Sequence, residues 1–160
     1  MVDTSELDNF IGKLEAAVPQ IKPKMAKILD HAGEKFLDLV QEQIEAEGNV
    51  DTRTLLSSFS KGSGNGIYRL DEGSLTLEIG TRVQYARWVN DGHSQQPGRF
   101  IPGVWSGDRF IYTPGAETGM VLKASFVEGS HFFDHAEIAF TFLFPDMVKE
   151  DAEALLRSIF

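Results

Sequence analysis

Apolar residues recur at helical spacing along the first part of the chain. Two prolines, Pro19 and Pro23, interrupt this pattern, and Pro23 suits an early position of a second helix. That second helix is expected to be long and to end near Glu47, before Gly48. The apolar positions of the first segment are Leu7, Phe10, Ile11 and Leu14, and those of the second are Met25, Ile28, Leu29, Ala32, Phe36, Leu39 and Val40.

The spacing changes after a short third helix, which is predicted over Leu55, Leu56 and Phe59 with Asp51 or Thr52 as its cap. The segments "IYRL" and "LTLEIG" alternate like strands around the turn "DEGS", which predicts a β-hairpin. A short helix is expected in "VQYARWVNDG", and strands are expected in "RFIYT" and "MVLKASFV". Two C-terminal helices follow, the second opened by Pro145.

Helices at both ends of a strand-rich middle indicate an α+β fold. We expect a long N-terminal helix and C-terminal helices packed on one face of an antiparallel sheet of about four strands. With 160 residues, a single domain over 1–160 is expected. It would have a helical part (1–60), a strand-rich part (61–130) that carries a docking loop (93–119), and the C-terminal helices (131–160).

Charge and composition narrow the classes of function. The formal charge is −9, so tight binding of DNA or RNA is disfavoured, since such proteins neutralise phosphates with basic groups. The chain has no cysteine, which excludes disulfides and thiolate metal sites. The sequence shows no secretory signal and no apolar stretch that could span a bilayer, so a soluble protein without membrane partners is expected.

Four acidic residues form one row on the long helix, opposite its apolar stripe. Like charges at this spacing oppose helix formation by about 0.2–0.5 kcal/mol per pair. One interpretation is a solvated helix face. In two other interpretations, the assembly offsets this cost. Either a basic strip of a neighbouring subunit covers the row, or the row lines a channel through which DNA slides. The row consists of Asp30, Glu34, Asp38 and Glu42.

An enzyme is the weaker interpretation. On a helix, the spacing of His131 and His135 would place two imidazoles on one face, and His93 could supply a third nitrogen for zinc or manganese. A metal-dependent hydrolase is therefore the alternative of another class. The segment lacks the glutamate of a metalloprotease motif, and no nucleophile elbow, Walker loop or dinucleotide fingerprint is present. We expect no catalytic residue, no metal and no cofactor.

Three segments in order, "VDTRTLLSSF", "LTLEIGTRVQYARWVNDGH" and "GSHFFDHAEIAF", resemble the tail-component family of tailed bacteriophages and defective prophages. The resemblance runs from Asp51 to the end of the chain. It departs from the family at Arg53, where glycine is preferred, and at His131, where proline is preferred. The residues that carry it, all expected to be structural, are Thr52, Leu55, Ser58, Tyr85, Ala86, Val89, Gly92, Phe132, Phe133 and Ala136.

The resemblance implies a non-enzymatic neck or tail-completion protein that joins the head connector to the tail. It further implies a homo-oligomeric ring, hexameric in our prediction, with head-connector and tail-tube or terminator proteins as partners. DNA would pass through the channel without specific binding. The protein would lie in the neck or tail of the virion, and in the host cytoplasm during assembly. A tail terminator or another minor tail protein is the alternative within the same particle.

The stretch "YARWVNDGHSQQPGRFIPGVW" is predicted to be a rigid docking loop. Buried aromatic and arginine side chains supply most of the binding energy at protein interfaces. The structural alternative is that Phe100 and Trp105 cover the core of the sheet. The candidate interface residues are Arg99, Phe100, Ile101, Val104, Trp105 and Arg109.

Overall fold

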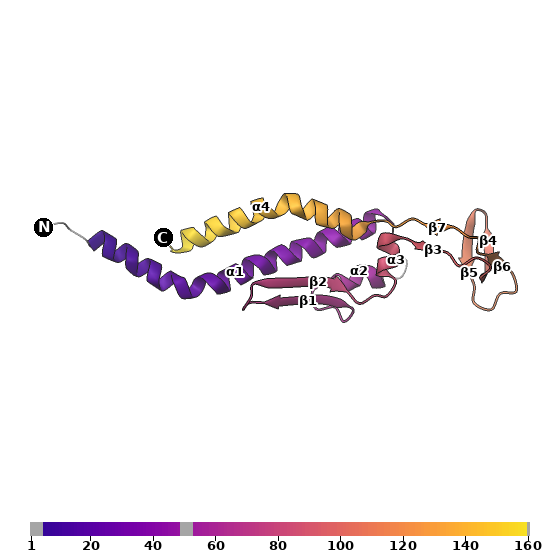
Figure 1. The fold of residues 1–160 in the computed structure, drawn as a ribbon, viewed down its shortest axis with the longest axis horizontal. Helices are drawn as coiled ribbons and strands as arrows, with labels where there is room; N and C mark the ends of the chain where they lie inside the picture. Colours follow the sequence, from indigo (N-terminus) through magenta and orange to yellow (C-terminus); the bar gives the residue numbers. More distant parts are fainter. Residues whose placement is uncertain (1–4, 49–52, 160) are drawn as a thin grey trace. The chain divides into compact units, whose positions relative to one another are not determined.

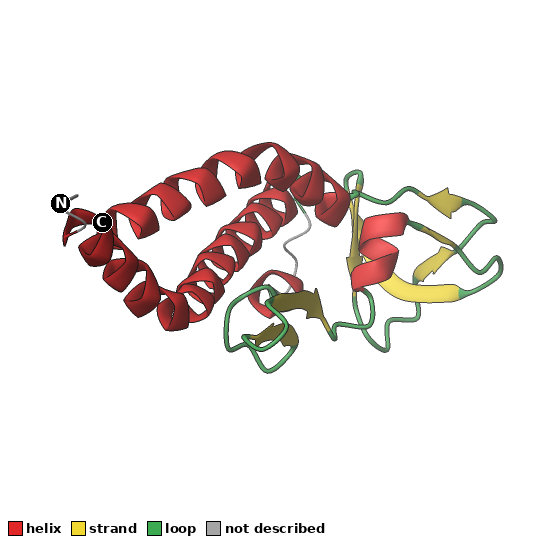
Figure 2. Ribbon diagram, turned by 60° about the vertical axis from the view of Figure 1, so that its left-hand side comes forward, coloured by secondary structure: helices red, strands yellow, loops and turns green. Residues whose placement is uncertain are grey.

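A computed structural model of the chain describes residues 5–48 and 53–159, which form two compact units. The first unit combines the chain up to Ala86 with the segment from Phe132 onward, and the second runs from Arg87 to His131. Helices dominate the first unit and short antiparallel strands the second, so the predicted α+β class is confirmed. Figure 2 shows the two kinds of secondary structure by colour.

Two long helices form the frame of the first unit. Helix α1 (Ser5–Ala46) lies antiparallel to helix α4 (Phe132–Ile159), as Figure 1 shows. Their contacting faces are rich in phenylalanine, and the ring of Phe36 meets those of Phe133 and Phe140 with centroids 5.4 and 5.3 Å apart. The buried apolar residues of this unit include Ala26, Ala32, Leu37, Leu39, Val40, Ile44, Leu55, Phe59, Phe132 and Ala136.

The prolines do not end the helices as predicted. Helix α1 continues through Pro19 and Pro23, and α4 continues through Pro145, so the expected break in the N-terminal segment and the expected pair of C-terminal helices are wrong. An interior proline removes one backbone hydrogen bond and bends a helix. Figure 1 shows both helices bent rather than broken.

A hairpin packs against α1. Strand β1 (Gly66–Asp71) pairs with β2 (Thr76–Thr81), which confirms the predicted hairpin, and the register places Leu70 opposite Leu77. The short helix α2 (Thr54–Ser58) precedes it. The Asp71 carboxylate holds the turn by accepting hydrogen bonds from the Gly73 and Ser74 amides and the Ser74 hydroxyl. These bonds lower the pKa of Asp71 below its usual value, with the Ser74 hydroxyl as the largest cause.

The hairpin approaches α1 closely at Gly33. A Cβ at this position would collide with the side chain of Leu77 and lie 2.7 Å from the hydroxyl of Tyr68. That hydroxyl cannot move freely, because it donates to the backbone oxygen and the carboxylate of Asp30. Glycine at this helical position therefore makes room for the β-sheet of the first unit.

We expect Gly33→Ala to lower the free energy of unfolding by about 1–2 kcal/mol. Alanine favours a helix over glycine by up to about 1 kcal/mol, but overpacking costs about 1–3 kcal/mol. Gly12→Ala is the matched control, since Gly12 lies on the same helix and an added Cβ there would meet no atom within 4 Å. The stability of the Gly12→Ala variant should rise. Urea unfolding measures both, and a stability gain in Gly33→Ala would contradict the close packing.

The second unit holds one short helix and two small sheets. It contains α3 (Ala86–Asp91, which starts at the boundary), β3 (His93–Ser94), β4 (Phe100–Ser106), β5 (Arg109–Tyr112), β6 (Gly119–Val121) and β7 (Phe126–Val127). Strand β4 lies between β5 and β6, and β3 pairs with β7. The short helix over 86–91 and its end at Gly92 are confirmed.

The expectation of a single sheet of about four strands is wrong, because the described strands form three separate sheets. The segment "MVLKASFV" divides into β6 and β7, which pair with different strands. The predicted docking loop is also largely strand: Phe100 to Ser106 form β4. Alternation in short strands predicts their existence but not their partners, because pairing depends on contacts distant in sequence.

Candidate functional site

The residues of the first motif hold the core of the first unit together. Leu55 and Ser58 are buried. The Ser58 hydroxyl donates to the Leu55 carbonyl at 2.7 Å and accepts from Thr81 Oγ1 at 2.7 Å, which joins α2 to the hairpin. Thr52 and the predicted cap Asp51 lie outside the described residues. Arg53, where the resemblance expects glycine, has a left-handed backbone with φ of 59°. Glycine adopts that conformation at no steric cost, which explains the preference.

The C-terminal motif completes the same core. Phe132 and Ala136 are buried on α4, and Phe133 is half-buried. The Phe132 ring lies 5.9 Å from that of Phe59 at a T-shaped angle. His131, where the resemblance expects proline, has φ of 54°. Proline cannot adopt that angle, so the backbone of this chain must differ there from a chain with proline.

The end of the second motif, "LTLEIGTRVQYARWVNDGH", packs within the second unit against the segment that leads into α4. At its end, Gly92 has φ of 79°, and the backbone of the segment before α4 passes so near that a Cβ would lie 2.5 Å from the Val127 oxygen. Two carbonyls of α3, those of Val89 and Asn90, accept hydrogen bonds from the amides of Ser130 and His131. Earlier in the motif, Ala86 is buried and Tyr85 is 37% exposed. Ala86 and Gly92 thus have packing and turn-forming roles, respectively, whereas Tyr85 is accessible.

The second unit exposes apolar side chains on one sheet face. Cross-strand register places Val104 opposite Ile111 and Phe100 opposite Val121, and positions two apart on a strand share a face. These four side chains are 45–59% exposed, and we call them the exposed sheet face. Monomeric proteins rarely expose large contiguous apolar patches, and such patches mark interaction sites.

The other candidate interface residues lie on the same strands. On the opposite face, Trp105 meets Phe110 with ring centroids 5.2 Å apart, yet remains 59% exposed. Ile101 is half-buried, and Arg99 and Arg109 are exposed. Trp105 and Phe100 are therefore accessible in the single chain, although the sequence also allowed them to be core residues.

The acidic row of α1 is partly neutralised within the chain. The Lys61 ammonium donates to Asp30 at 2.7 Å and to Glu34 at 2.8 Å. The hydrogen bond from Lys61 to Asp30 is the main reason that the pKa of Asp30 lies below its usual value. Tyr68 also donates to Asp30, and its pKa is raised, mainly by burial. The remaining members, Asp38 and Glu42, are exposed, so a neighbour or channel would meet a shorter row than predicted.

The histidine pair does not form the predicted helical site. His131 precedes α4 and has a positive φ, so the helical spacing to His135 does not apply. The His135 ring instead faces Glu47 at 3.8 Å, and His93 lies beside Trp88 with ring centroids 6.1 Å apart. In residues 5–48 and 53–159, no three His, Cys, Asp or Glu side chains gather as metal ligands would. The same segments contain no helix with the length and apolarity to cross a membrane.

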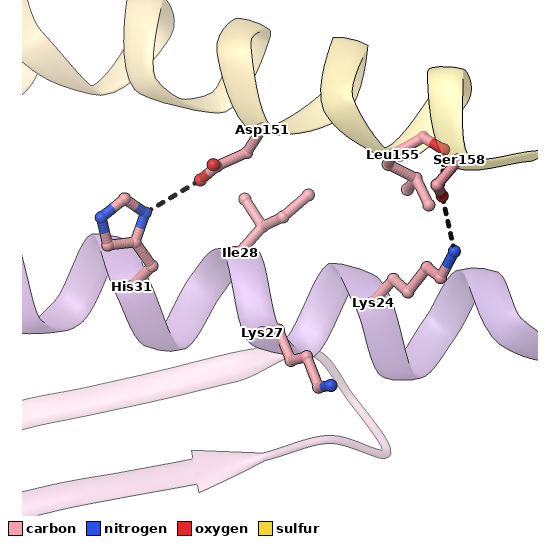
Figure 3. A pocket seen from close by; sticks show the side chains of 7 residues that line it. All are labelled: Lys24, Lys27, Ile28, His31, Asp151, Leu155 and Ser158. Atoms are coloured by element: carbon pink, nitrogen blue, oxygen red, sulfur yellow. Dashed lines mark hydrogen bonds and ion pairs between the residues drawn. The ribbon is translucent and has the colours of Figure 1, made fainter.

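Two adjoining hollows lie between α1 and α4. The smaller, about 240 Å³, contains two polar contacts: His31 Nδ1 lies 3.0 Å from Asp151, and Lys24 donates to the Ser158 hydroxyl at 2.8 Å (Figure 3). The larger, about 390 Å³, is apolar, and we call it the apolar groove. Its lining residues are Ile21, Met25, Ile28, Leu29, Leu75, Phe144, Val148, Ala152, Leu155 and Leu156.

The smaller hollow thus pairs His31 with Asp151 and Lys24 with Ser158, whereas the apolar groove is lined by apolar side chains. Comparison with known families indicates what kind of protein carries these surfaces. The family described as "Bacteriophage HK97-gp10, putative tail-component" matches residues 6–92, which is more than half of the chain. The chain belongs to the HK97-gp10-like family. It is therefore related to phage tail components, and the predicted family resemblance is confirmed.

Two relatives of this HK97-gp10-like chain come from Bacillus subtilis (strain 168). The protein YqbI, described as uncharacterized, is 43% identical over 146 residues, which cover 86% of this chain and 87% of YqbI. The phage-like element PBSX protein XkdI is 37% identical over 147 residues, which cover 91% of each chain. No solved structure matched the chain.

The extent of the family segment corrects the sequence prediction. We expected the resemblance to begin at Asp51, but the HK97-gp10-like segment begins at residue 6 and so contains all but the first residue of α1. It ends at residue 92, directly after α3. The exposed sheet face and α4 lie outside it, whereas both Bacillus relatives align over more of the chain.

The sequence analysis did not identify several residues that shape the acidic row, the packing of the hairpin on α1 and the apolar groove. Lys61 and Tyr68 meet Asp30 from across the fold, Gly33 admits the hairpin, and Leu75 lines the apolar groove. One signal was present: the apolar stripe of 10–14 continues in phase with that of 25–32, as expected for one helix rather than two.

Proposed function

We propose that this chain is a non-enzymatic structural protein of a phage or phage-like particle, in a neck or tail-completion ring between head connector and tail. The observation that carries the proposal is membership of a phage tail-component family, together with a relative named as a protein of the phage-like element PBSX. The ring is homo-oligomeric, and we propose a hexamer. Its location is the virion, after assembly in the host cytoplasm.

The exposed apolar surfaces support a role in assembly. A catalytic protein needs a set of positioned polar groups, whereas this chain displays the exposed sheet face and Trp105 to solvent. We propose that these residues contact a neighbouring subunit or the tail, with Arg99 and Arg109 at the rim. Aromatic and arginine residues of this kind are enriched at interface hot spots.

The charge supports passage of DNA without specific binding. A net charge of −9 gives an average repulsion toward phosphates, and Asp38 and Glu42 add exposed carboxylates on α1. We propose that this remaining part of the acidic row faces the channel. Asp30 and Glu34 contribute less, because Lys61 already compensates them.

Deletion of the gene from an inducible phage or prophage that encodes this protein tests the proposed position. Loss of a neck or tail-completion protein should leave filled heads and finished tails that do not join, visible by electron microscopy, and a plasmid copy should restore joining. Tails of irregular length would instead identify a tail terminator. Normal infectious particles would contradict any structural role.

Trp105→Ala should abolish or weaken assembly without unfolding the chain. Trp105 is 59% exposed, so its truncation removes few core contacts, but a hot-spot tryptophan contributes about 2 kcal/mol or more to an interface. Thermal melting of the isolated protein and complementation of the gene deletion measure the two effects. A large loss of stability, with particle assembly intact, would show that Trp105 belongs to the core.

A further inference from the structure

Helix α1 carries one continuous apolar stripe whose two halves differ in surroundings. Its positions, Phe10, Ile11, Leu14, Val18, Ile21, Met25 and Ile28, follow the 3–4 spacing of a helix-packing face. From Ile21 onward the stripe forms one wall of the apolar groove. Leu75, at the hairpin turn, contributes another wall although its φ of 53° is unfavourable for leucine. The groove is thus built from three separate elements.

The first half of the stripe lies open to solvent. Ser158, in the last turn of α4, meets Lys24, so the helix before Ile21 extends past the described end of α4. Figure 1 shows this end of α1 reaching beyond α4. The exposed fractions of its apolar side chains are 47% at Phe10, 43% at Ile11, 41% at Leu14 and 65% at Val18. Contiguous exposure of this kind indicates a surface that is covered in an assembly.

Charge along the stripe changes sign between the two halves. The open half carries Glu6, Asp8 and Glu15 with a single base, Lys13. The groove half, from Pro19 to Ile28, carries Lys22, Lys24 and Lys27 and no acid. Glu6 and Asp8 also favour the helix itself, because they lie near its positive N-terminus. Glu15 and the three lysines lie beyond the first turn, where that effect is small.

One chain therefore carries an acidic apolar helix and an apolar groove whose α1 wall is basic. The helix cannot enter the groove of its own chain, because both belong to the same continuous α1. We propose that residues 6–18 of one copy lie antiparallel in the apolar groove of a second copy. Glu15 then lies toward Lys22 and Lys24 of that copy, and Glu6, about 13 Å away along the same helix, lies further along the groove. Asp151, an acid of α4 near this region, already faces His31.

This inference rests on the proposed ring function and supplies one contact between its subunits. A contact in which a segment of one subunit enters a groove of the next can repeat around a ring, and an antiparallel pair can also be mutual. In either arrangement the acidic segment meets the basic groove. The prediction therefore concerns self-association of the full chain, which can be measured without the particle.

Charge reversal with rescue tests the proposal in sedimentation velocity of the purified full chain. The acidic variant is Glu6→Lys with Glu15→Lys, and the basic variant is Lys22→Glu with Lys24→Glu. Each should weaken self-association at least about tenfold, since like charges oppose docking. The combination of all four changes in one chain should restore association, because the segment and the α1 wall of the groove again carry opposite charge. Lys123→Glu, an exposed reversal in the second unit, is the control and should leave it unchanged.

Circular dichroism of every variant establishes that the helices are intact. The proposal is overturned if the combined variant stays dissociated. It is also overturned if the wild-type chain remains monomeric at about 0.1 mM, where a contact with a Kd of about 10 μM would be mostly formed. If the reversed variants assemble normal particles, the contact is wrong and the ring function stands. If rescue succeeds but the protein is absent from particles, the contact stands and the ring function fails.

Discussion

Phe59→Ala should lower the free energy of unfolding by about 3–5 kcal/mol, which is enough to unfold a large part of the protein. Phe59 is 1% exposed, and its ring packs at a T-shaped angle on Phe132 of α4. Truncation removes buried apolar surface and leaves a cavity between elements distant in sequence. The Phe59 carbonyl also accepts a hydrogen bond from Gln41 at 2.7 Å, so a shift of this backbone would disturb α1.

Urea unfolding followed by circular dichroism measures the effect, and Phe142→Ala is the matched control. Phe142 lies on α4 and is 76% exposed, so its truncation should change stability by less than about 0.5 kcal/mol. Equal effects of the two substitutions would contradict the position of the core.

Gly92→Ala should destabilise the second unit by about 2–5 kcal/mol. A φ of 79° costs a non-glycine residue about 1–2 kcal/mol, and a Cβ would also lie 2.5 Å from the Val127 oxygen and 2.7 Å from the Gly129 nitrogen. Both atoms belong to the backbone, so relief requires movement of the segment that leads into α4. Overpacking adds about 1–3 kcal/mol.

Gly98→Ala separates the two causes. Gly98 has φ of 82°, but no atom lies within 4 Å of an added Cβ, so only the backbone cost of about 1–2 kcal/mol is expected. Hydrogen exchange of amides in residues 87–131 is the appropriate measurement, because it reports this unit separately from the helices. Similar losses of protection in both variants would show that the close backbone contact at Gly92 is unimportant.

Much of the architecture could be predicted from local patterns. The hairpin around "DEGS" follows from alternation and a turn sequence, and the helix end at Gly92 follows from glycine's access to positive φ. The prolines misled the prediction, because an interior proline can bend a helix without ending it. Helix α1 spans Pro19 and Pro23 since its stripe continues in phase across them.

The site could be predicted less well than the fold. Lys61 lies 31 residues from Asp30 and meets it only after the hairpin packs on α1. The apolar groove likewise requires α1, α4 and Leu75 together, so no single segment indicates it. Exposure of Val104 and Trp105 was expected from composition, but their position on β4 was not, because glycine and proline in that segment resemble a loop.

The metal alternative illustrates the limit of spacing arguments. His131 and His135 are four residues apart, but the helix begins at Phe132, one residue too late for the spacing to place both imidazoles on one face. The positive φ of His131 sets that start. A motif on a helix is only as informative as the predicted helix boundary.

A cryo-EM reconstruction of the neck of a particle that carries this protein tests the proposed function most directly. We expect a ring of copies between the head connector and the tail, with the segment 6–18 of one copy in the apolar groove of its neighbour. The exposed sheet face should be covered by protein in that ring. Density for this protein elsewhere in the particle, or its absence from purified particles by mass spectrometry, would contradict the proposed neck position.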